Sequence, residues 1–138
     1  MAEQPDAVET ALRALRFHDR TAAELAARLE QRGVGEAERV QALETLERIG
    51  YVDDERFART RAEQLAERGS GDALIRDDLE RRGLAADVID LAVGALEPEQ
   101  ERATRIADHR GRSAKTARYL ASRGFGEEAL EGLVAMED

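Results

Sequence analysis

The sequence contains no cysteine and no tryptophan, and it has only two prolines. Without cysteine there can be no disulfide framework, no thiolate metal site and no cysteine nucleophile. No apolar run approaches the roughly 18–20 residues that cross a bilayer, and residues 1–6 lack the basic and apolar regions of a signal peptide. We therefore expect a cytoplasmic protein that makes no membrane contact.

Aromatic residues are also scarce, at 4% of the chain, and β-branched residues are few. Alanine, leucine, glutamate and arginine dominate instead, a composition that favours helices over strands. The 138 residues carry a formal net charge of -9. This acidity disfavours nonspecific DNA binding as the main activity, because such binding requires a basic surface. The composition predicts an all-α protein.

One short phrase, Leu-x-x-Arg-Gly-apolar, occurs three times, although composition alone predicts far less than one copy. The copies begin at Leu29, Leu79 and Leu120. Each lies at the expected end of a helix, where glycine supplies the left-handed residue that stops it. Before the first copy, Thr21 and Glu24 have the spacing of an N-terminal capping box. We therefore interpret the chain as an internal repeat built on this repeated phrase.

A further helix is predicted before each phrase helix and another after each glycine, which gives nine short helices in three triplets. The helices that open the triplets are expected at Val8–Arg16, Asp54–Arg68 and Pro98–His109. The triplets divide the chain into three helical repeat units, at residues 1–52, 53–96 and 97–138. Because helices of ~10–15 residues are marginal alone, each unit must be stabilised by packing with its neighbours. We expect three tandem three-helix repeat units in an elongated array, straight or curved.

Apolar residues at helical spacing identify the inner face of each predicted helix. In the third copy, Thr116 takes the place that Leu25 and Ile75 hold in the first two, so we expect a weaker or rotated apolar face there. The other expected inner residues are Val8, Leu12 and Leu15 in the first helix, Val40, Leu43 and Leu46 in the third, Phe57, Ala58, Ala62 and Leu65 in the fourth, Ile89, Ala92 and Leu96 in the sixth, Ala103, Ile106 and Ala107 in the seventh, and Leu130 and Leu133 in the ninth.

The sequence offers no candidate active site. The two histidines, His18 and His109, lie in different units, and neither has partners at metal-ligand spacing. The run Asp53-Asp54-Glu55 lacks the alternating ligands of a calcium loop and suits the N-terminus of a helix. We therefore expect no enzymatic activity, no metal and no cofactor.

The strongest charge feature is a basic tract between residues 102 and 123, in which seven positive side chains face a single acid, Asp108. Three of its members recur at a spacing of three residues and are expected on one helical face, with Tyr119 available for stacking. The tract is a candidate for contact with phosphates or with an acidic protein surface. Alternatively, its charges are solvated or paired with nearby glutamates. The candidate binding residues are Arg102, Arg105, Arg110, Arg112, Lys115, Arg118 and Arg123.

The junction Gly50-Tyr51-Val52-Asp53-Asp54-Glu55-Arg56-Phe57-Ala58 closely resembles the signature of the RecX family, bacterial regulators of the RecA recombinase. The resemblance extends to the opening Ala11-Leu12-Arg13, to the phrase helix of the first copy and to the terminal Tyr119-Leu120-x-x-Arg123-Gly124-Phe125. It covers about residues 8–134.

What the resemblance implies is a non-enzymatic, all-helical protein of three tandem three-helix units that acts in DNA repair, recombination and the SOS response. Family members bind the RecA filament on single-stranded DNA and inhibit its recombination, ATPase and coprotease activities. We accordingly expect the RecA filament as partner, weak contact with single-stranded DNA at most, and a monomer. The alternative function is a helical nucleic-acid-binding module that acts directly through the basic tract.

The junction also has a structural interpretation, in which its residues connect the first two units. Tyr51 and Phe57 flank a capped turn and are expected to lock unit one onto unit two, although contact with a partner is the other option. The signature residues assigned to this junction are Gly50, Tyr51, Asp53, Asp54, Glu55, Arg56 and Phe57.

Overall fold

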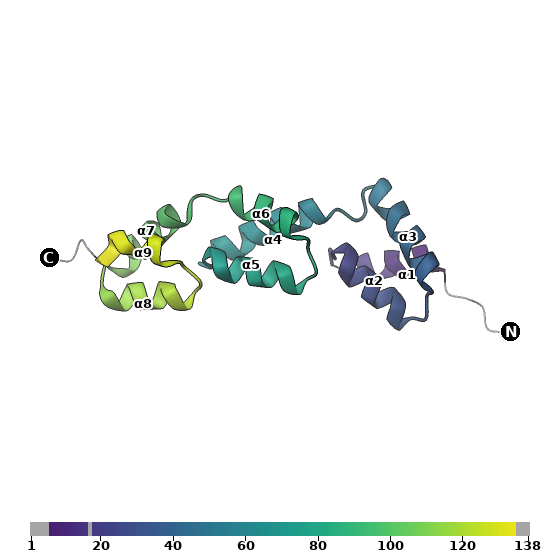
Figure 1. Cartoon of the computed structure of the whole chain (residues 1–138), viewed down its shortest axis with the longest axis horizontal. Helices are drawn as coiled ribbons and strands as arrows, with labels where there is room; N and C mark the ends of the chain where they lie inside the picture. The colour runs from purple at the N-terminus through teal and green to yellow at the C-terminus, as the bar shows by residue number, and fades with distance from the viewer. Residues whose placement is uncertain (1–5, 17, 135–138) are drawn as a thin grey trace. The chain divides into compact units, whose positions relative to one another are not determined.

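The computed structural model describes residues 6–16 and 18–134, and within these ranges it contains nine α-helices and no strand (Figure 1). The all-α prediction is confirmed. No helix of these ranges is both long and apolar enough to cross a membrane. The helices are α1 (Ala7–Leu15), α2 (Ala22–Gln31), α3 (Glu36–Arg48), α4 (Asp54–Glu67), α5 (Asp72–Arg81), α6 (Ala86–Gly94), α7 (Glu99–Arg110), α8 (Ala114–Ser122) and α9 (Glu127–Val134).

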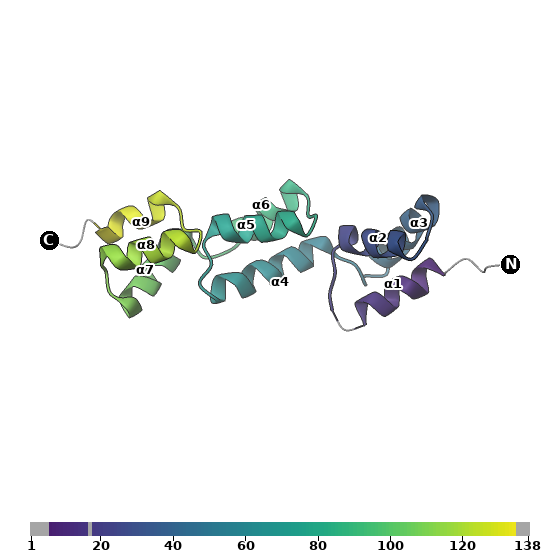
Figure 2. The same ribbon diagram turned by 90° about the horizontal axis from the view of Figure 1, so that it is seen from below.

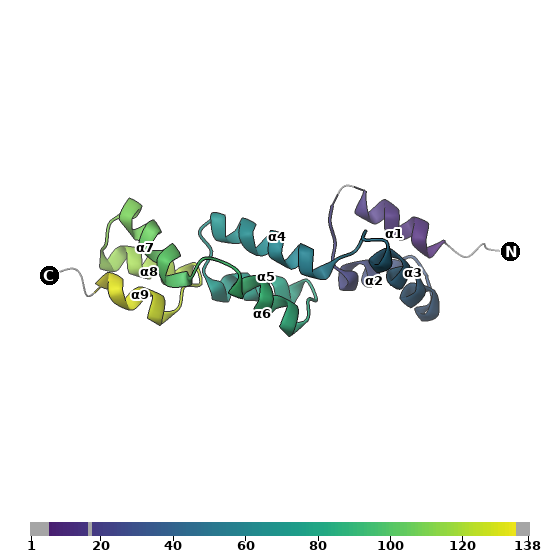
Figure 3. The same cartoon turned by 90° about the horizontal axis from the view of Figure 1, so that it is seen from above.

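The helices belong to two compact units. The first consists of Met1–Phe57 together with Arg82–Leu84, and the second of Ala58–Arg81 and Ala85–Asp138. Within the first unit, α1, α2 and α3 all contact one another, and they lie side by side in each view (Figures 1 and 2). Within the second, α7, α8 and α9 form the corresponding trio, and α5 packs on α6 (Figure 3).

The repeated phrase ends a helix in all three copies. Gly33, Gly83 and Gly124 have positive φ angles of 83°, 82° and 91°, as expected for helix-stopping glycines. In the first copy the backbone N–H of Val34 donates to the carbonyl oxygen of Leu29 at 3.0 Å, which closes the last turn. The phrase leucines are fully buried, so the predicted inner face of each middle helix is confirmed.

The predicted helix starts are confirmed as well. The backbone N–H of Glu24 donates to Thr21 Oγ1 at 3.1 Å, and the Thr21 N–H donates to Glu24 Oε1 at 3.0 Å, which completes the capping box. The Asp53 carboxylate accepts a 3.0 Å hydrogen bond from the backbone N–H of Arg56 and caps α4 in the same way.

Two of the predicted inner residues are wrong, and alanine is the reason in both helices. α1 packs through Ala11 and Ala14, and its Leu12 is 38% exposed. α3 buries Ala42 and Leu46, whereas Val40 is 50% exposed. Small side chains allow helix backbones to approach closely, so a stripe that contains alanine is buried in place of a neighbouring stripe with larger residues.

The third phrase helix keeps the face of the other two, so the predicted rotation is wrong. Thr116 is only 5% exposed and occupies the buried place of Leu25 and Ile75. Its hydroxyl is satisfied locally, because Ser113 Oγ donates to Thr116 Oγ1 at 3.3 Å and accepts from the Thr116 backbone N–H at 3.2 Å. A buried polar group with a partner costs little, so the threonine is tolerated at this buried position.

Candidate partner-binding surface

The basic tract is divided between two helices and a turn. Gly111, with φ of 100°, ends α7, and Ser113 caps α8, so Arg112 lies in the turn between them. Arg112 Nε donates to the Asp108 carboxylate at 3.0 Å. The expected face of three basic residues on one helix is therefore wrong. Only Lys115 and Arg118 share it.

Arg102 is buried, with 6% of its surface exposed. Its guanidinium donates to the carbonyl oxygens of Ser70 at 3.0 Å and Glu97 at 2.9 Å, pairs with the Asp72 carboxylate, and lies 5.8 Å from the ring centroid of Phe125. A buried guanidinium must be neutralised and hydrogen-bonded, and these contacts do both. Arg102 thus links the start of α7 to the start of α5 and is withdrawn from any partner.

Two further groups complete this buried cluster. Glu99 accepts from the backbone N–H of Asp72 at 2.6 Å and from that of Gly126 at 3.0 Å, so it joins three helices of the second unit. Burial raises the pKa of the Asp72 carboxyl, and the charge of Glu99 raises it further, while Arg102 opposes both. The sequence pattern does not indicate Asp72 or Ser70 as partners of Arg102. Glu99 is one of the acids near the tract that could have paired with it, and in the structure it accepts from backbone N–H groups. The break at Gly69-Ser-Gly71 was the only signal that this point differs from the other helix starts.

Three more arginines of the tract make contacts within the protein. Arg105 pairs with Glu97 on the surface, and its hydrogen bond lowers the pKa of the Glu97 carboxyl. Arg123 donates to the carbonyl oxygen of Arg68 at 3.3 Å. The Arg110 guanidinium lies 3.7 Å from the ring centroid of Tyr119, so the aromatic face expected for stacking already carries a cation–π contact.

What the tract presents to solvent is a smaller surface. Lys115 and Arg118 are exposed on α8, and no ion pair involves either among the residues that the structure describes. Arg110, the last residue of α7, is exposed as well, and its guanidinium lies over the ring of Tyr119 on α8. We call Arg110, Lys115 and Arg118 the α8 patch. It gathers three cations and is the part of the basic tract with the geometry to attract an anionic partner.

The junction residues hold the start of α4 against the start of α2, within the first unit. Asp54 Oδ1 accepts from the backbone N–H of Ala22 at 2.9 Å, which satisfies a free N–H group of the α2 N-terminus. Gly50 adopts φ of 85°, and its carbonyl oxygen accepts from the Arg56 guanidinium at 3.2 Å. Glu55 is exposed.

The aromatic residues of the junction differ in their surroundings. Phe57 is half-buried, and the guanidinium of Arg82 lies 5.6 Å from its ring centroid. Arg82 also pairs with Glu24 at 3.4 Å, within the same unit. The Tyr51 side chain is 57% exposed and contributes little to packing. Most of the signature residues therefore make contacts inside the protein, and Tyr51 is an aromatic member that is exposed to solvent.

Across the described ranges, no three His, Asp or Glu side chains are grouped so that they could hold a metal ion. His18 and His109 are both exposed. The described residues form helix caps, a buried ion pair and an exposed cationic patch, and such a patch suits the binding of a partner.

The sequence aligns with bacterial regulatory proteins over nearly its whole length. It is 33% identical to the regulatory protein RecX of Syntrophotalea carbinolica, over 94% of this chain and 95% of that protein. The chain belongs to the RecX family. The RecX of Halorhodospira halophila is 31% identical over 94% of this chain and 87% of its own length. That of Deinococcus radiodurans is 35% identical over 87% of this chain, which spans 62% of that longer relative. RecX is a family of regulatory proteins and not of enzymes.

The fold comparisons agree with this assignment. The protein-family model for the second three-helix domain of RecX matches residues 53–93 of this chain. A crystal structure of RecX from Lactobacillus salivarius superimposes with a TM-score of 0.80 over 92% of this chain and 91% of that one, at 16% identity. A second RecX crystal structure gives a TM-score of 0.77 at 22% identity. The prediction of a helical fold with RecX-type three-helix domains is confirmed.

Proposed function

We propose that this protein binds the filament that the RecA recombinase forms on single-stranded DNA and restrains its recombination, ATPase and coprotease activities. The observation that carries the proposal is the alignment with RecX proteins over nearly the whole chain, including relatives that it covers almost end to end. The RecX resemblance implies a RecA partner. The acidic overall charge of -9 fits a role in which the protein filament, more than DNA alone, is recognised.

The test is an ATPase assay. RecA is assembled on single-stranded DNA, the protein is added in increasing amounts, and ATP hydrolysis is followed. We expect inhibition at or below a stoichiometric ratio. Undiminished hydrolysis at stoichiometric excess would overturn the proposal.

We further propose that the α8 patch contributes to this contact. Lys115 and Arg118 are exposed and lie one turn apart on α8, and neither forms an ion pair with the residues that the structure describes, so reversing their charge changes the local potential without breaking a salt bridge there. The double variant Lys115→Glu, Arg118→Glu is compared with the matched variant Arg48→Glu, Arg59→Glu, whose sites are exposed elsewhere. Loss of inhibition in the first variant alone assigns the patch to the interface. Equal inhibition by both variants would remove the patch from it.

The alternative function is direct binding of nucleic acid through the same patch. The specific observation in its favour is that the α8 patch is basic within an otherwise acidic chain. A gel shift with single-stranded DNA in the absence of RecA separates the two functions. If the patch variant loses DNA binding and still inhibits RecA, the patch serves nucleic acid.

A further inference from the structure

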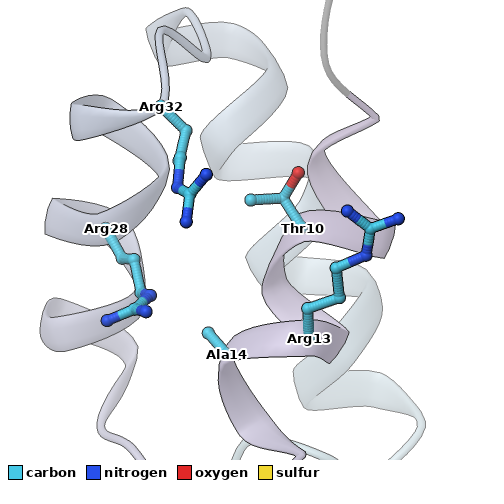
Figure 4. A pocket seen from close by; sticks show the side chains of 5 residues that line it. All are labelled: Thr10, Arg13, Ala14, Arg28 and Arg32. Atoms are coloured by element: carbon cyan, nitrogen blue, oxygen red, sulfur yellow. The ribbon is translucent and has the colours of Figure 1, made fainter.

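A basic pocket of about 310 Å³ lies between α1 and α2 in the first unit (Figure 4). Arg28 and Arg32 line it from α2 and its C-terminal end, and Arg13 lines it from α1. Figure 4 shows the Arg32 side chain extending into the space between the two helices. Thr10 and Ala14 complete the wall, so the lining residues that the structure describes include no acid and no aromatic ring.

The positive charge of this pocket is only partly neutralised. Arg13 pairs with Glu9 at 2.8 Å, but both side chains are well exposed, and such pairs are weak. The α2 C-terminus contributes roughly half a negative charge at most. Neither Arg28 nor Arg32 has an ion-pair partner in the described part of the chain. Three guanidinium groups therefore share about one and a half opposing charges.

In the second copy of the repeat, an ion pair within the protein occupies the position that corresponds to this pocket. The residue just before the phrase leucine is Arg28 in the first copy and Asp78 in the second. Asp78 receives a bidentate ion pair from Arg61, with both N–O distances 3.0 Å. The buried residues Ala11 and Ala62 place Thr10 of α1 where α4 has Arg61. The first copy thus lacks both members of the pair.

The third copy closes this place in another way. Its residue before the phrase leucine is Tyr119, which is covered by the guanidinium of Arg110. In two copies, a cation from the first helix therefore meets an anion or an aromatic ring on the second. In the first copy a small hydroxyl residue faces an arginine, and a pocket remains.

We propose that this pocket binds a phosphate group. Phosphate presents several charged oxygens in a tetrahedral arrangement, which suits the two guanidinium donors of Arg28 and Arg32, whereas a single carboxylate is satisfied by one bidentate arginine. The Thr10 hydroxyl is a further donor. The described lining residues are arginines, a threonine and an alanine, which offer donors for a phosphate group and no ring on which a base could stack. Its source is either a free polyphosphate or the backbone of a nucleic-acid strand.

The experiment measures binding of pyrophosphate by calorimetry and of a short labelled oligothymidylate by fluorescence anisotropy, at about 0.15 M salt, where distant charges are screened. For the double variant Arg28→Gln, Arg32→Gln we expect binding of at least one probe to weaken by about tenfold or more, as charge-assisted hydrogen bonds are lost. The matched variant Arg48→Gln, Arg59→Gln makes the same change of charge outside the pocket and should bind as the native protein does.

A second variant fills the pocket in the manner of the second repeat. The exchange Thr10→Arg, Arg28→Asp introduces the pair that Arg61 and Asp78 form, and we expect it to abolish the pocket-dependent binding while the helical circular dichroism and the unfolding midpoint are kept. This variant separates loss of the site from loss of the fold.

The outcomes are distinct. Pocket-dependent binding of both probes, with pyrophosphate displacing the oligonucleotide, assigns the site to a strand phosphate. Pocket-dependent binding of pyrophosphate alone assigns it to a free polyphosphate. Native affinity in both pocket variants, or pocket-dependent binding of a polyglutamate peptide in place of either probe, overturns the proposal. The assay contains no RecA, so its result is independent of the ATPase test above.

Discussion

The hydroxyl of Thr21 donates a 2.7 Å hydrogen bond to the carbonyl oxygen of Arg82, a residue 61 positions later in the chain. Thr21 Oγ1 also accepts a hydrogen bond from the backbone N–H of Glu24 and so caps α2. One fully buried hydroxyl therefore both caps the start of α2 and anchors the backbone of Arg82 within the first unit.

Replacing Thr21 with valine keeps its shape and removes both hydrogen bonds. We expect the free energy of unfolding to fall by about 2–4 kcal/mol, the sum of a lost cap and a buried acceptor left without its partner. Urea unfolding followed by circular dichroism measures this. Thr21→Ser keeps the hydroxyl and should cost about 1 kcal/mol, for one methyl group. Equal effects from the two variants would show that the hydroxyl contributes nothing.

Gly71 lies where backbone segments meet. Its N–H donates to the carbonyl oxygen of Arg123 at 2.8 Å, and a Cβ at this position would stand 2.4 Å from the backbone of Gly124 and Phe125. We expect Gly71→Ala to destabilise the second unit by at least about 2 kcal/mol, because backbone cannot yield as a flexible side chain can.

The matched control is Gly94→Ala at the end of α6. A Cβ there meets nothing within 4 Å, so alanine should be neutral or stabilise by a few tenths of a kcal/mol. The two unfolding midpoints, measured under one set of conditions, check the pair of predictions. A Gly71→Ala protein as stable as Gly94→Ala would contradict the close approach.

Arg102 and Arg105 lie one turn apart on α7 and differ in burial, with 7% and 60% of their side chains exposed. Arg102→Gln leaves the half-buried Asp72 carboxylate without its cation and the carbonyl oxygens of Ser70 and Glu97 without their donor, so we expect a loss of about 3–5 kcal/mol. Arg105→Gln removes only a surface pair and should leave stability nearly unchanged. Thermal unfolding of both variants checks this difference. If the removed charge alone mattered, the two variants would lose the same stability.

The Asp72 carboxyl gives the protein a pH dependence of known sign. Its pKa in the folded state is raised, chiefly by burial, so the folded protein binds this proton more tightly than the unfolded chain does. The contribution of this group to stability is therefore greatest below its ordinary pKa of 3.8 and is lost as the pH rises through the folded pKa. An NMR titration of the Asp72 side chain should give a midpoint above 3.8, and a midpoint below it would reverse this sign.

The features that could be predicted from the sequence are those set by local chemistry. The phrase glycines need only their own backbone to stop a helix, and Thr21 needs only Glu24 to form a capping box. Helix faces were harder to assign. Hydrophobicity predicts Leu12 and Val40 as inner residues, but α1 and α3 bury faces that contain alanine instead. Which face is buried depends on the helix packed against it, and the sequence does not show that.

In the candidate site too, contacts between segments distant in the sequence could not be predicted, whereas features within one helix could. Nothing near Arg102 in the sequence indicates that Ser70 and Asp72 surround it, so its assignment to the binding tract could not be refined before the fold was seen. Lys115 and Arg118 needed no such information, because they are exposed on one helix. The division into three repeats at residues 52 and 96 and the elongated array stay predictions.

A chain that repeats one phrase three times can misfold by packing a helix of one copy against helices of another. The carboxylates that cap the N-termini of α2 and α5 disfavour such packing. Asp54 accepts from the first N–H of α2, and Glu99 accepts from the first N–H of α5. Both acids begin their own helix, but they differ in reach by one methylene, and Glu99 also needs the N–H of Gly126. An exchanged arrangement would leave a helix start without its acceptor. Such small differences in side-chain length disfavour the exchange of helices between copies of the repeat during folding. They also disfavour domain swapping between molecules.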